Sequence, residues 1–148
     1  GQIDETLNSL FAGGDYGAIV VGIDNGGSER LNEYSPWNNP QYGGGQGALY
    51  IDFIAETLKP YIDANYRTLE SPETTAIIGS SMGALISTYG ALAHPESFGK
   101  VGALSPAYWF SYSNFTSYID DLANDTNDLK LYFVAGNNEY GNMVTHVT

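Results

Sequence analysis

The residues best suited to chemistry form the pentapeptide "GSSMG" at positions 79–83, which matches the pattern G-x-S-x-G. A short apolar run comes directly before it, and a stretch rich in small residues follows it. In such a strand-turn-helix setting the pattern predicts that the central serine, Ser81, is a nucleophile held on a strained turn. The backbone N–H of Met82, in the first turn of the helix, would then face a developing oxyanion. The alternative is a corner of small residues where a strand meets a helix. The rival hydroxyl, that of Ser80, is expected to pack or to form a hydrogen bond beneath the turn.

A serine nucleophile needs a base that takes its proton and a carboxylate that orients the base. Glu139 follows the apolar run "LKLYFVAG" and comes after Ser81 in the chain, which is the order expected for that carboxylate. The alternative for Glu139 is a solvated loop side chain. Of the two histidines, His94 is expected to be a surface or capping residue, and His146 follows Glu139 too closely to return to Ser81. The sequence therefore predicts that the base lies outside this chain.

The elements that would position these residues alternate between strands and helices. Four apolar segments predict strands, at 18–24, 74–79, 101–105 and 129–136. Helical spacing or helix-compatible composition predicts helices at 2–12, 47–66, 83–93 and 113–124. The expected fold is therefore α/β, with a mostly parallel sheet of at least four strands and helices on both faces. Ligands bind at the carboxyl ends of such strands, where Ser81 and Glu139 fall.

Two other features bear on the site. Pro60 is expected to kink or divide the helix at 47–66. Residues 24–45 are rich in glycine, proline and asparagine and predict a long surface loop. Aromatic side chains lie in this loop and after the third predicted strand, and three of them could line a substrate pocket or could equally belong to the core: Trp37, Tyr108 and Trp109.

Composition narrows the possible partners. The 148 residues suit one domain, and five basic against 17 acidic residues give a net charge of −12. That charge repels nucleic acid and anionic membranes, so neither is expected as a partner. Cysteine is absent, which excludes disulfides and thiolate zinc sites, and no metal or organic cofactor is implied. Without a visible targeting signal or membrane span the chain is expected to be soluble, and the compartment stays open between cytoplasmic and secreted or periplasmic.

Several longer segments resemble one family. They are "IVVGIDNGGSERLNEYSPW", "YIDFIAETLKPYIDANYRT", "AIIGSSMGAL", "HPESFGKVGALSPAYWF" and "LYFVAGNNE". Over residues 4–141 the chain resembles the central portion of the putative esterase family of α/β-hydrolases, which includes S-formylglutathione hydrolase and the feruloyl, acetyl-xylan and enterochelin esterases. The resemblance implies that Ser81 is the nucleophile, that the Met82 amide is half of the oxyanion hole and that Glu139 is the acid.

The same resemblance implies that parts of the enzyme are missing. Family members have further strands before this start, and a last strand and the catalytic histidine beyond this end. Residues 1–148 are therefore expected to be a single, truncated α/β-hydrolase domain with an exposed sheet edge that favours self-association. The segment with Arg30, Glu33 and Tyr34 matches one near the active-site rim in the family. An internal network that pins the long loop is its expected role.

Two functional hypotheses follow. The first is a serine carboxylic-ester hydrolase that acts through an acyl-enzyme on a small-molecule or glycan-linked ester. The alternative is a non-catalytic binding domain of the same fold. A glycoside hydrolase that uses Asp120 and Asp121 is a weaker third possibility, because those residues lie in a predicted helix on the flank of the sheet.

Overall fold

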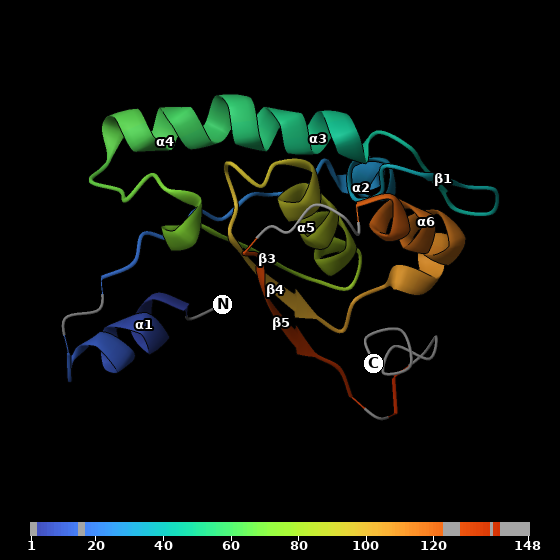
Figure 1. Cartoon of the computed structure of the whole chain (residues 1–148). Helices are drawn as coiled ribbons and strands as arrows, with labels where there is room; N and C mark the ends of the chain where they lie inside the picture. The colour runs from blue at the N-terminus through green and yellow to red at the C-terminus, as the bar shows by residue number, and fades with distance from the viewer. Residues whose placement is uncertain (1–2, 15–16, 123–127, 137, 140–148) are drawn as a thin grey trace.

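The computed structural model describes residues 3–14, 17–122, 128–136 and 138–139. It is a mixed α/β structure whose main sheet has three parallel strands (Figure 1). The helices are α1 (Ile3–Phe11), α2 (Arg30–Glu33), α3 (Gly47–Phe53), α4 (Lys59–Asn65), α5 (Met82–Ala93) and α6 (Tyr112–Leu122), with the short helical turns η1 (Gly27–Glu29), η2 (Ile54–Leu58), η3 (Pro72–Thr74) and η4 (Tyr108–Ser111). The strands are β1 (Asn38–Asn39), β2 (Gly43–Gly44), β3 (Ala76–Ser80), β4 (Lys100–Leu104) and β5 (Lys130–Val134).

The main sheet has the order β3-β4-β5, and each parallel step is made through a helix. Helix α5 connects β3 to β4, and α6 lies between β4 and β5 in the chain. The register aligns Ser80 with Leu104 and Leu104 with Val134, so the carboxyl ends of all three strands meet at one edge. This edge is where the sequence predicted the candidate residues to gather.

Helix α5 covers one face of this sheet. On that face Val101 and Ala103 are 3% and 0% exposed, and they form a core with Ala84 and Ile86 of α5. Phe133 of β5 also packs against this core and against the second one, to which α6 contributes Phe115. In the described part of the chain the packed helices therefore lie on one face of the main sheet, whereas the sequence analysis expected them on both.

The strand expected at 18–24 is absent, and this expectation is corrected. Residues 17–26 form neither helix nor strand, and Ile19 and Val20 are 50% and 52% exposed. A cavity of about 1130 Å³ is lined by this segment and by β3, among others. Apolar β-branched residues form a strand only when a neighbouring strand accepts their hydrogen bonds. Among the described residues, no strand lies beside the outer edge of β3. Self-association through that edge stays a prediction.

Residues 47–65 form one continuous helical rod, with η2 as a π-helical turn between α3 and α4 (Figure 1). The N–H of Lys59 donates to the carbonyl of Ile54, five residues back. In a regular α-helix the ring of Pro60 would collide with the carbonyl four residues earlier. The wider π turn directly before Pro60 accommodates this constraint, so the proline does not divide the helix.

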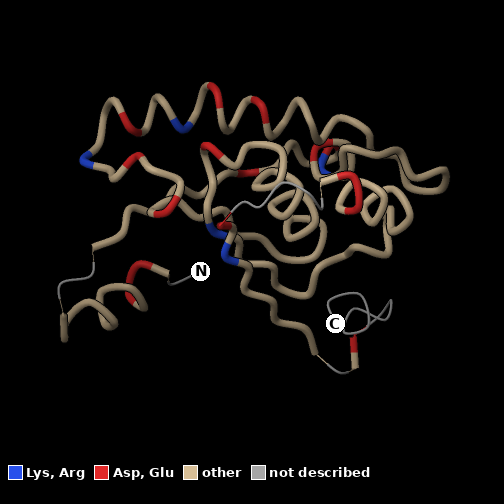
Figure 2. Tube along the Cα trace, viewed as in Figure 1, with Lys and Arg blue, Asp and Glu red and all other residues tan. Residues whose placement is uncertain are grey.

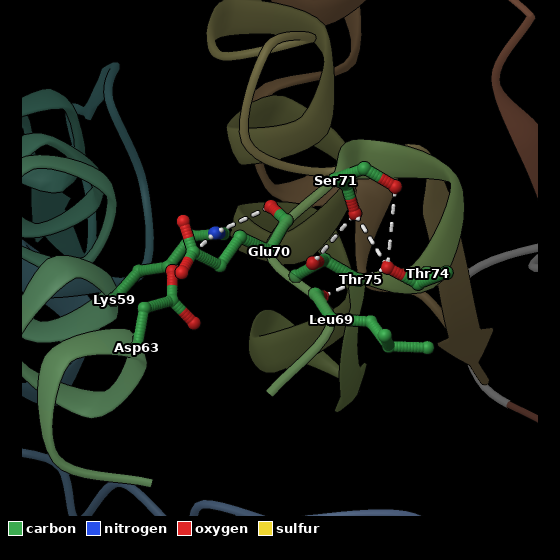
Figure 3. Close-up of polar contacts among 7 residues, drawn as sticks. All are labelled: Lys59, Asp63, Leu69, Glu70, Ser71, Thr74 and Thr75. Carbon is green, nitrogen blue, oxygen red and sulfur yellow. Dashed lines mark hydrogen bonds and ion pairs between the residues drawn. The ribbon is translucent and has the colours of Figure 1, made fainter. Parts of the chain in front are cut away.

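A hydrogen bond from Lys59 ties the connection between α4 and β3 to the helix, and further hydrogen bonds lie within the connection (Figure 3). The ammonium Nζ of Lys59 lies 2.7 Å from Asp63 Oδ2 and donates to the carbonyl of Glu70 at 2.8 Å. Thr74 Oγ1 donates to the carbonyl of Leu69 at 2.8 Å. These bonds fix the path by which the chain leaves the long helix and enters β3.

Charge is distributed unevenly over this fold (Figure 2). Acidic residues occur along the long helix and in the loops, and Lys and Arg residues are few. Lys100 and Lys130 are register neighbours at the amino ends of β4 and β5, whereas Glu139 follows the carboxyl end of β5. Within the described ranges no helix is both long and apolar enough to cross a membrane.

Candidate active site

Ser81 lies in the turn between β3 and α5. Its backbone has φ 57° and ψ −121°, a region that residues other than glycine rarely adopt. The turn is fixed from the neighbouring strand: the N–H of Ser81 donates to the carbonyl of Leu104 at 2.9 Å, and the N–H of Ala107 donates to the carbonyl of Ser81 at 3.1 Å. Ser81 is partly exposed at the carboxyl edge of the sheet. The backbone of Ser81 is thus unusual for a serine, and its role as a nucleophile stays a prediction.

The two glycines of the pentapeptide are not equivalent. A Cβ on Gly79 would overlap the carbonyl of Gly83 and approach the nitrogen of Ala84 to 2.9 Å, so only glycine fits. A Cβ on Gly83 would meet only the ring of Tyr34, at an ordinary contact distance of 3.8 Å. The close approach of strand and helix therefore requires glycine at position 79, whereas a Cβ would fit at position 83.

Met82 begins α5, and its side chain, 4% exposed, anchors the start of the helix in the second core. Backbone N–H groups in the first turn of a helix have no acceptor within the helix, and the helix dipole makes this end positive. The Met82 amide can therefore stabilise an oxyanion beside Ser81. Ser80 is still in β3, aligned with Leu104. Its side chain is exposed on the uncovered face, because alternate residues of a strand point to opposite faces, so the expectation that it packs beneath the turn is wrong.

Glu139 lies in a turn after β5, where the sequence analysis placed it. The turn is closed by a hydrogen bond of 3.3 Å from the N–H of Glu139 to the carbonyl of Gly136. A Cβ on Gly136 would lie 2.8 Å from Glu139 Oε1, so the glycine makes room for the carboxylate. Oε1 accepts a hydrogen bond of 2.8 Å from Ser105 Oγ, which follows β4.

Ser105 was not predicted as a site residue. It lies at the end of a strand that the sequence predicts, and the sequence pattern gives it no role. In the structure Ser105 is one of two described non-glycine residues with positive φ, at 47°, and the other is Ser81. The signal that could have found it is its position at the carboxyl end of the strand between those of Ser81 and Glu139.

His94 caps the far end of α5, as expected. Its N–H donates to the carbonyl of Gly90 at 2.9 Å, and its ring nitrogens Nε2 and Nδ1 lie 2.9 Å from Asp52 Oδ1 and 3.0 Å from Glu96 Oε1. Burial lowers the pKa of His94, but the hydrogen bonds with the two carboxylates outweigh burial and raise it. A helix of this length separates His94 from Ser81 by roughly 18 Å. His146 lies outside the described residues.

The three aromatic residues expected near a pocket contribute to packing. Trp37 makes an edge contact with Phe115, with ring centroids 5.9 Å apart. Tyr108 is 3% exposed, stacks on Phe115 at 4.4 Å and shares a hydrogen bond of 2.7 Å with Thr88; burial raises its pKa to about 12 despite that bond. Trp109 is half-buried. None of the three lines the 1130 Å³ cavity, and their role in a substrate pocket stays a prediction.

The segment with Arg30, Glu33 and Tyr34 does pin the long loop. The guanidinium of Arg30 lies over the ring of Tyr34, 5.3 Å from its centroid. Glu33 Oε2 accepts a hydrogen bond of 2.8 Å from the N–H of Gly26. Because the Tyr34 ring also faces Gly83, this network ties the loop to the turn that carries Ser81.

No group of three or more His, Cys, Asp or Glu residues in the described ranges could hold a metal ion. The acidic pair Asp120 and Asp121 is exposed on α6, at the flank of the sheet. The candidate site therefore consists of Ser81, the Met82 amide, Ser105 and Glu139 at the carboxyl edge.

Comparisons with known proteins indicate the family and the fold of this chain. A family model described as "Putative esterase" matches residues 1–145. The uncharacterized protein YbbA of Bacillus subtilis (strain 168) is 33% identical over 110 residues, which cover 70% of this chain and 43% of YbbA.

Two solved structures share the fold. The BES protein from Bacillus cereus has a TM-score of 0.67 at 22% identity, covering 87% of this chain and 50% of that one. The IroE-like serine hydrolase from Shewanella oneidensis has a TM-score of 0.60 at 23% identity, covering 71% and 36%. The chain thus spans half or less of the length of these relatives.

Proposed function

This chain belongs to the putative esterase family, and we propose that it hydrolyses carboxylic esters through an acyl-enzyme formed on Ser81. The backbone of Ser81 carries the proposal, because a non-glycine residue with φ 57° and ψ −121° stands between a strand and a helix within G-x-S-x-G. The likeness to a protein described as a serine hydrolase supports the choice of a serine nucleophile.

In the proposed reaction Ser81 Oγ attacks the ester carbonyl carbon while a base takes the hydroxyl proton. The N–H of Met82 stabilises the oxyanion of the tetrahedral intermediate. The C–O bond to the alcohol then breaks, and the alcohol leaves with the proton returned by the base. Water, activated by the same base, releases the acid and restores Ser81.

Glu139 is the proposed acid that orients the base and stabilises its charged form. It follows β5, the second strand from β3 in the sheet, and its carboxylate is held by Ser105. The base is assigned to a histidine outside the described residues, because His94 is bound to Asp52 and Glu96 at the far end of α5.

A non-catalytic binding domain is the competing function. The strain at Ser81 argues against it, since an unusual backbone conformation costs about 1–3 kcal/mol and is retained where function needs it. Only glycine fits at position 79, and it lets the helix start this close to the strand. This close approach also favours the catalytic function over the binding function.

A fluorophosphonate probe tests the proposal on the full-length protein. We expect the probe to label Ser81 in the folded protein, to leave Ser80 unlabelled in peptide maps, and to fail after denaturation. The Ser81→Ala variant should lose both labelling and ester hydrolysis, and Ser113→Ala, a change at an exposed position of α6, should keep both. A folded full-length protein without label on Ser81 would favour the binding function.

A further inference from the structure

We propose that Ser105 is a positioning residue that holds the Glu139 carboxylate in the orientation needed for catalysis. This inference rests on the proposed role of Glu139 as the acid. Ser105 Oγ donates to Glu139 Oε1 at 2.8 Å, across 34 positions of sequence. The other carboxylate oxygen, Oε2, is then presented as the acceptor for the N–H of the base.

Glu139 needs such a support because the sheet does not hold its side chain. It is exposed and lies in a turn beyond the end of β5. A glutamate side chain has several rotamers of similar energy, and only one orientation can serve a base. A hydrogen bond to an ionised carboxylate is stronger and shorter than one between neutral groups, so one hydroxyl can select that orientation.

Ser105 itself is rigidly placed. Its N–H donates to the carbonyl of Val134 at 2.6 Å, and the next two residues, Pro106 and Ala107, are almost fully buried. The N–H of Ala107 also donates to the carbonyl of Ser81. The segment 105–107 therefore contacts the backbone of the nucleophile at one end and the carboxylate of the acid at the other.

The register explains why this residue can bridge the site. Ser81, Ser105 and Ala135 come directly after the aligned strand residues Ser80, Leu104 and Val134. Neighbouring strands are about 4.8 Å apart, so the strand ends that carry the nucleophile and the acid are separated by roughly 10 Å. Ser105 occupies the middle position of that gap.

The backbone conformation of Ser105 is a second, independent indication that this residue positions Glu139. With φ 47° it adopts a conformation that glycine or asparagine would adopt more readily. A serine in this conformation keeps a hydroxyl directed at Glu139. The two described positive-φ residues other than glycine are thus the proposed nucleophile and the residue that supports the acid.

The inference is tested by measuring ester hydrolysis by the full-length protein and by its variants Ser105→Ala and Ser105→Gly. Both variants remove the hydroxyl, but glycine tolerates the positive φ and alanine does not. We expect both to lower kcat about tenfold with little change in KM, which corresponds to about 1.4 kcal/mol of lost stabilisation. The acid limb of the kcat/KM profile should move to lower pH, because a less well oriented carboxylate favours the charged base less.

A double-mutant cycle with Glu139→Ala separates a positioning role from an independent one. If Ser105 acts through Glu139, adding Ser105→Gly to Glu139→Ala should cause no further loss of activity. Additive losses would overturn the inference, and so would an effect confined to the alanine variant at position 105, since that would reflect backbone strain. The Ser113→Ala variant serves as the control.

The same measurements distinguish this inference from the proposed function. Full activity in Glu139→Ala would remove the acid assignment and with it the role of Ser105. Impaired Glu139→Ala together with unimpaired Ser105 variants would overturn the role of Ser105 alone. Ser81→Ala with undiminished activity would contradict the proposed function itself.

Discussion

On the α5 face of the main sheet Val101 and Ala103 are 3% and 0% exposed, whereas on the opposite face Ile78 and Tyr132 are 67% and 68% exposed. The same strands supply both faces, because successive side chains of a strand point in opposite directions. The packed face continues into the turn at Ser81 through the start of α5. The turn at Ser81 is therefore built on the packed side of the sheet, where backbone positions are fixed by close contact, whereas Glu139 is exposed beyond the end of β5.

The largest difference in stability should be between a substitution on the packed side of the sheet and one on the open face. Leu85 of α5 is 0% exposed in the second core, and Leu85→Ala should lower the free energy of unfolding by about 2–5 kcal/mol. Ile78→Thr keeps a β-branched side chain on the open face and should change it by about 0.5 kcal/mol or less. Urea denaturation of both variants measures the contrast, and equal losses would show that the open face is covered in solution.

On the packed side, substitution by alanine should change stability differently at the two glycines of the pentapeptide, Gly79 and Gly83. Gly79→Ala forces a Cβ against the Gly83 carbonyl and should destabilise by about 1–3 kcal/mol, with slower fluorophosphonate labelling of Ser81. Gly83→Ala places its Cβ at an ordinary distance from Tyr34 and should keep or slightly raise the stability, since alanine favours a helix. A Gly79→Ala variant as stable as the Gly83→Ala variant would contradict the close approach seen at this turn.

His94 makes the stability of the folded state depend on pH. Its pKa is raised in the folded state above the unfolded value of about 6.5, because hydrogen bonds with Asp52 and Glu96 outweigh burial. The resulting stabilisation is complete below the unfolded pKa and is lost as the pH rises through the folded pKa. The stability difference between wild type and His94→Gln should therefore shrink from pH 6 toward alkaline pH. A constant difference across this range would exclude the linkage.

The smallest effect on stability is expected beside the outer edge of β3, where Lys59 and Asp63 line the cavity. Burial opposes ionisation of Asp63, but its hydrogen bond with Lys59, a contribution from Thr68 and the charge of Lys59 together outweigh burial and lower its pKa. This stabilisation is present above the unfolded pKa and is lost as the pH falls through the folded pKa. Asp63→Asn should lower stability at pH 7 by about 0.5 kcal/mol, and the difference should vanish in acid. A difference that persists at pH 2 would point to packing as the cause.

Much of the site was predictable because its signals are local. The apolar run before Ser81 and the small residues after it predict a strand and a helix, and both are confirmed as β3 and α5. The turn from Gly136 to Glu139 was also expected from its position after the last strand. The hydrogen bond that closes the turn at Glu139 joins residues three positions apart, whereas β3 also depends on its pairing with the distant strand β4.

Other features depended on which segments become neighbours. The run at 18–24 has the composition of a strand but no strand beside it in the described structure. Pro60 predicts a kink or a division of the helix, and a π-helical turn before it keeps the helix continuous. Trp37 and Tyr108 could equally have lined a pocket, and their contacts with Phe115 place them in the packing between loop and helix.

The sequence by itself determined the nucleophile candidate, because five adjacent residues and the elements on either side define the turn at Ser81. Only the tertiary structure decided that Gly79, and not Gly83, is sterically required, and that Ser105 supports Glu139 across 34 positions. The physical reason is the register of the sheet. It aligns the ends of β3, β4 and β5, and no pattern within one segment records which residues of other segments will stand beside it.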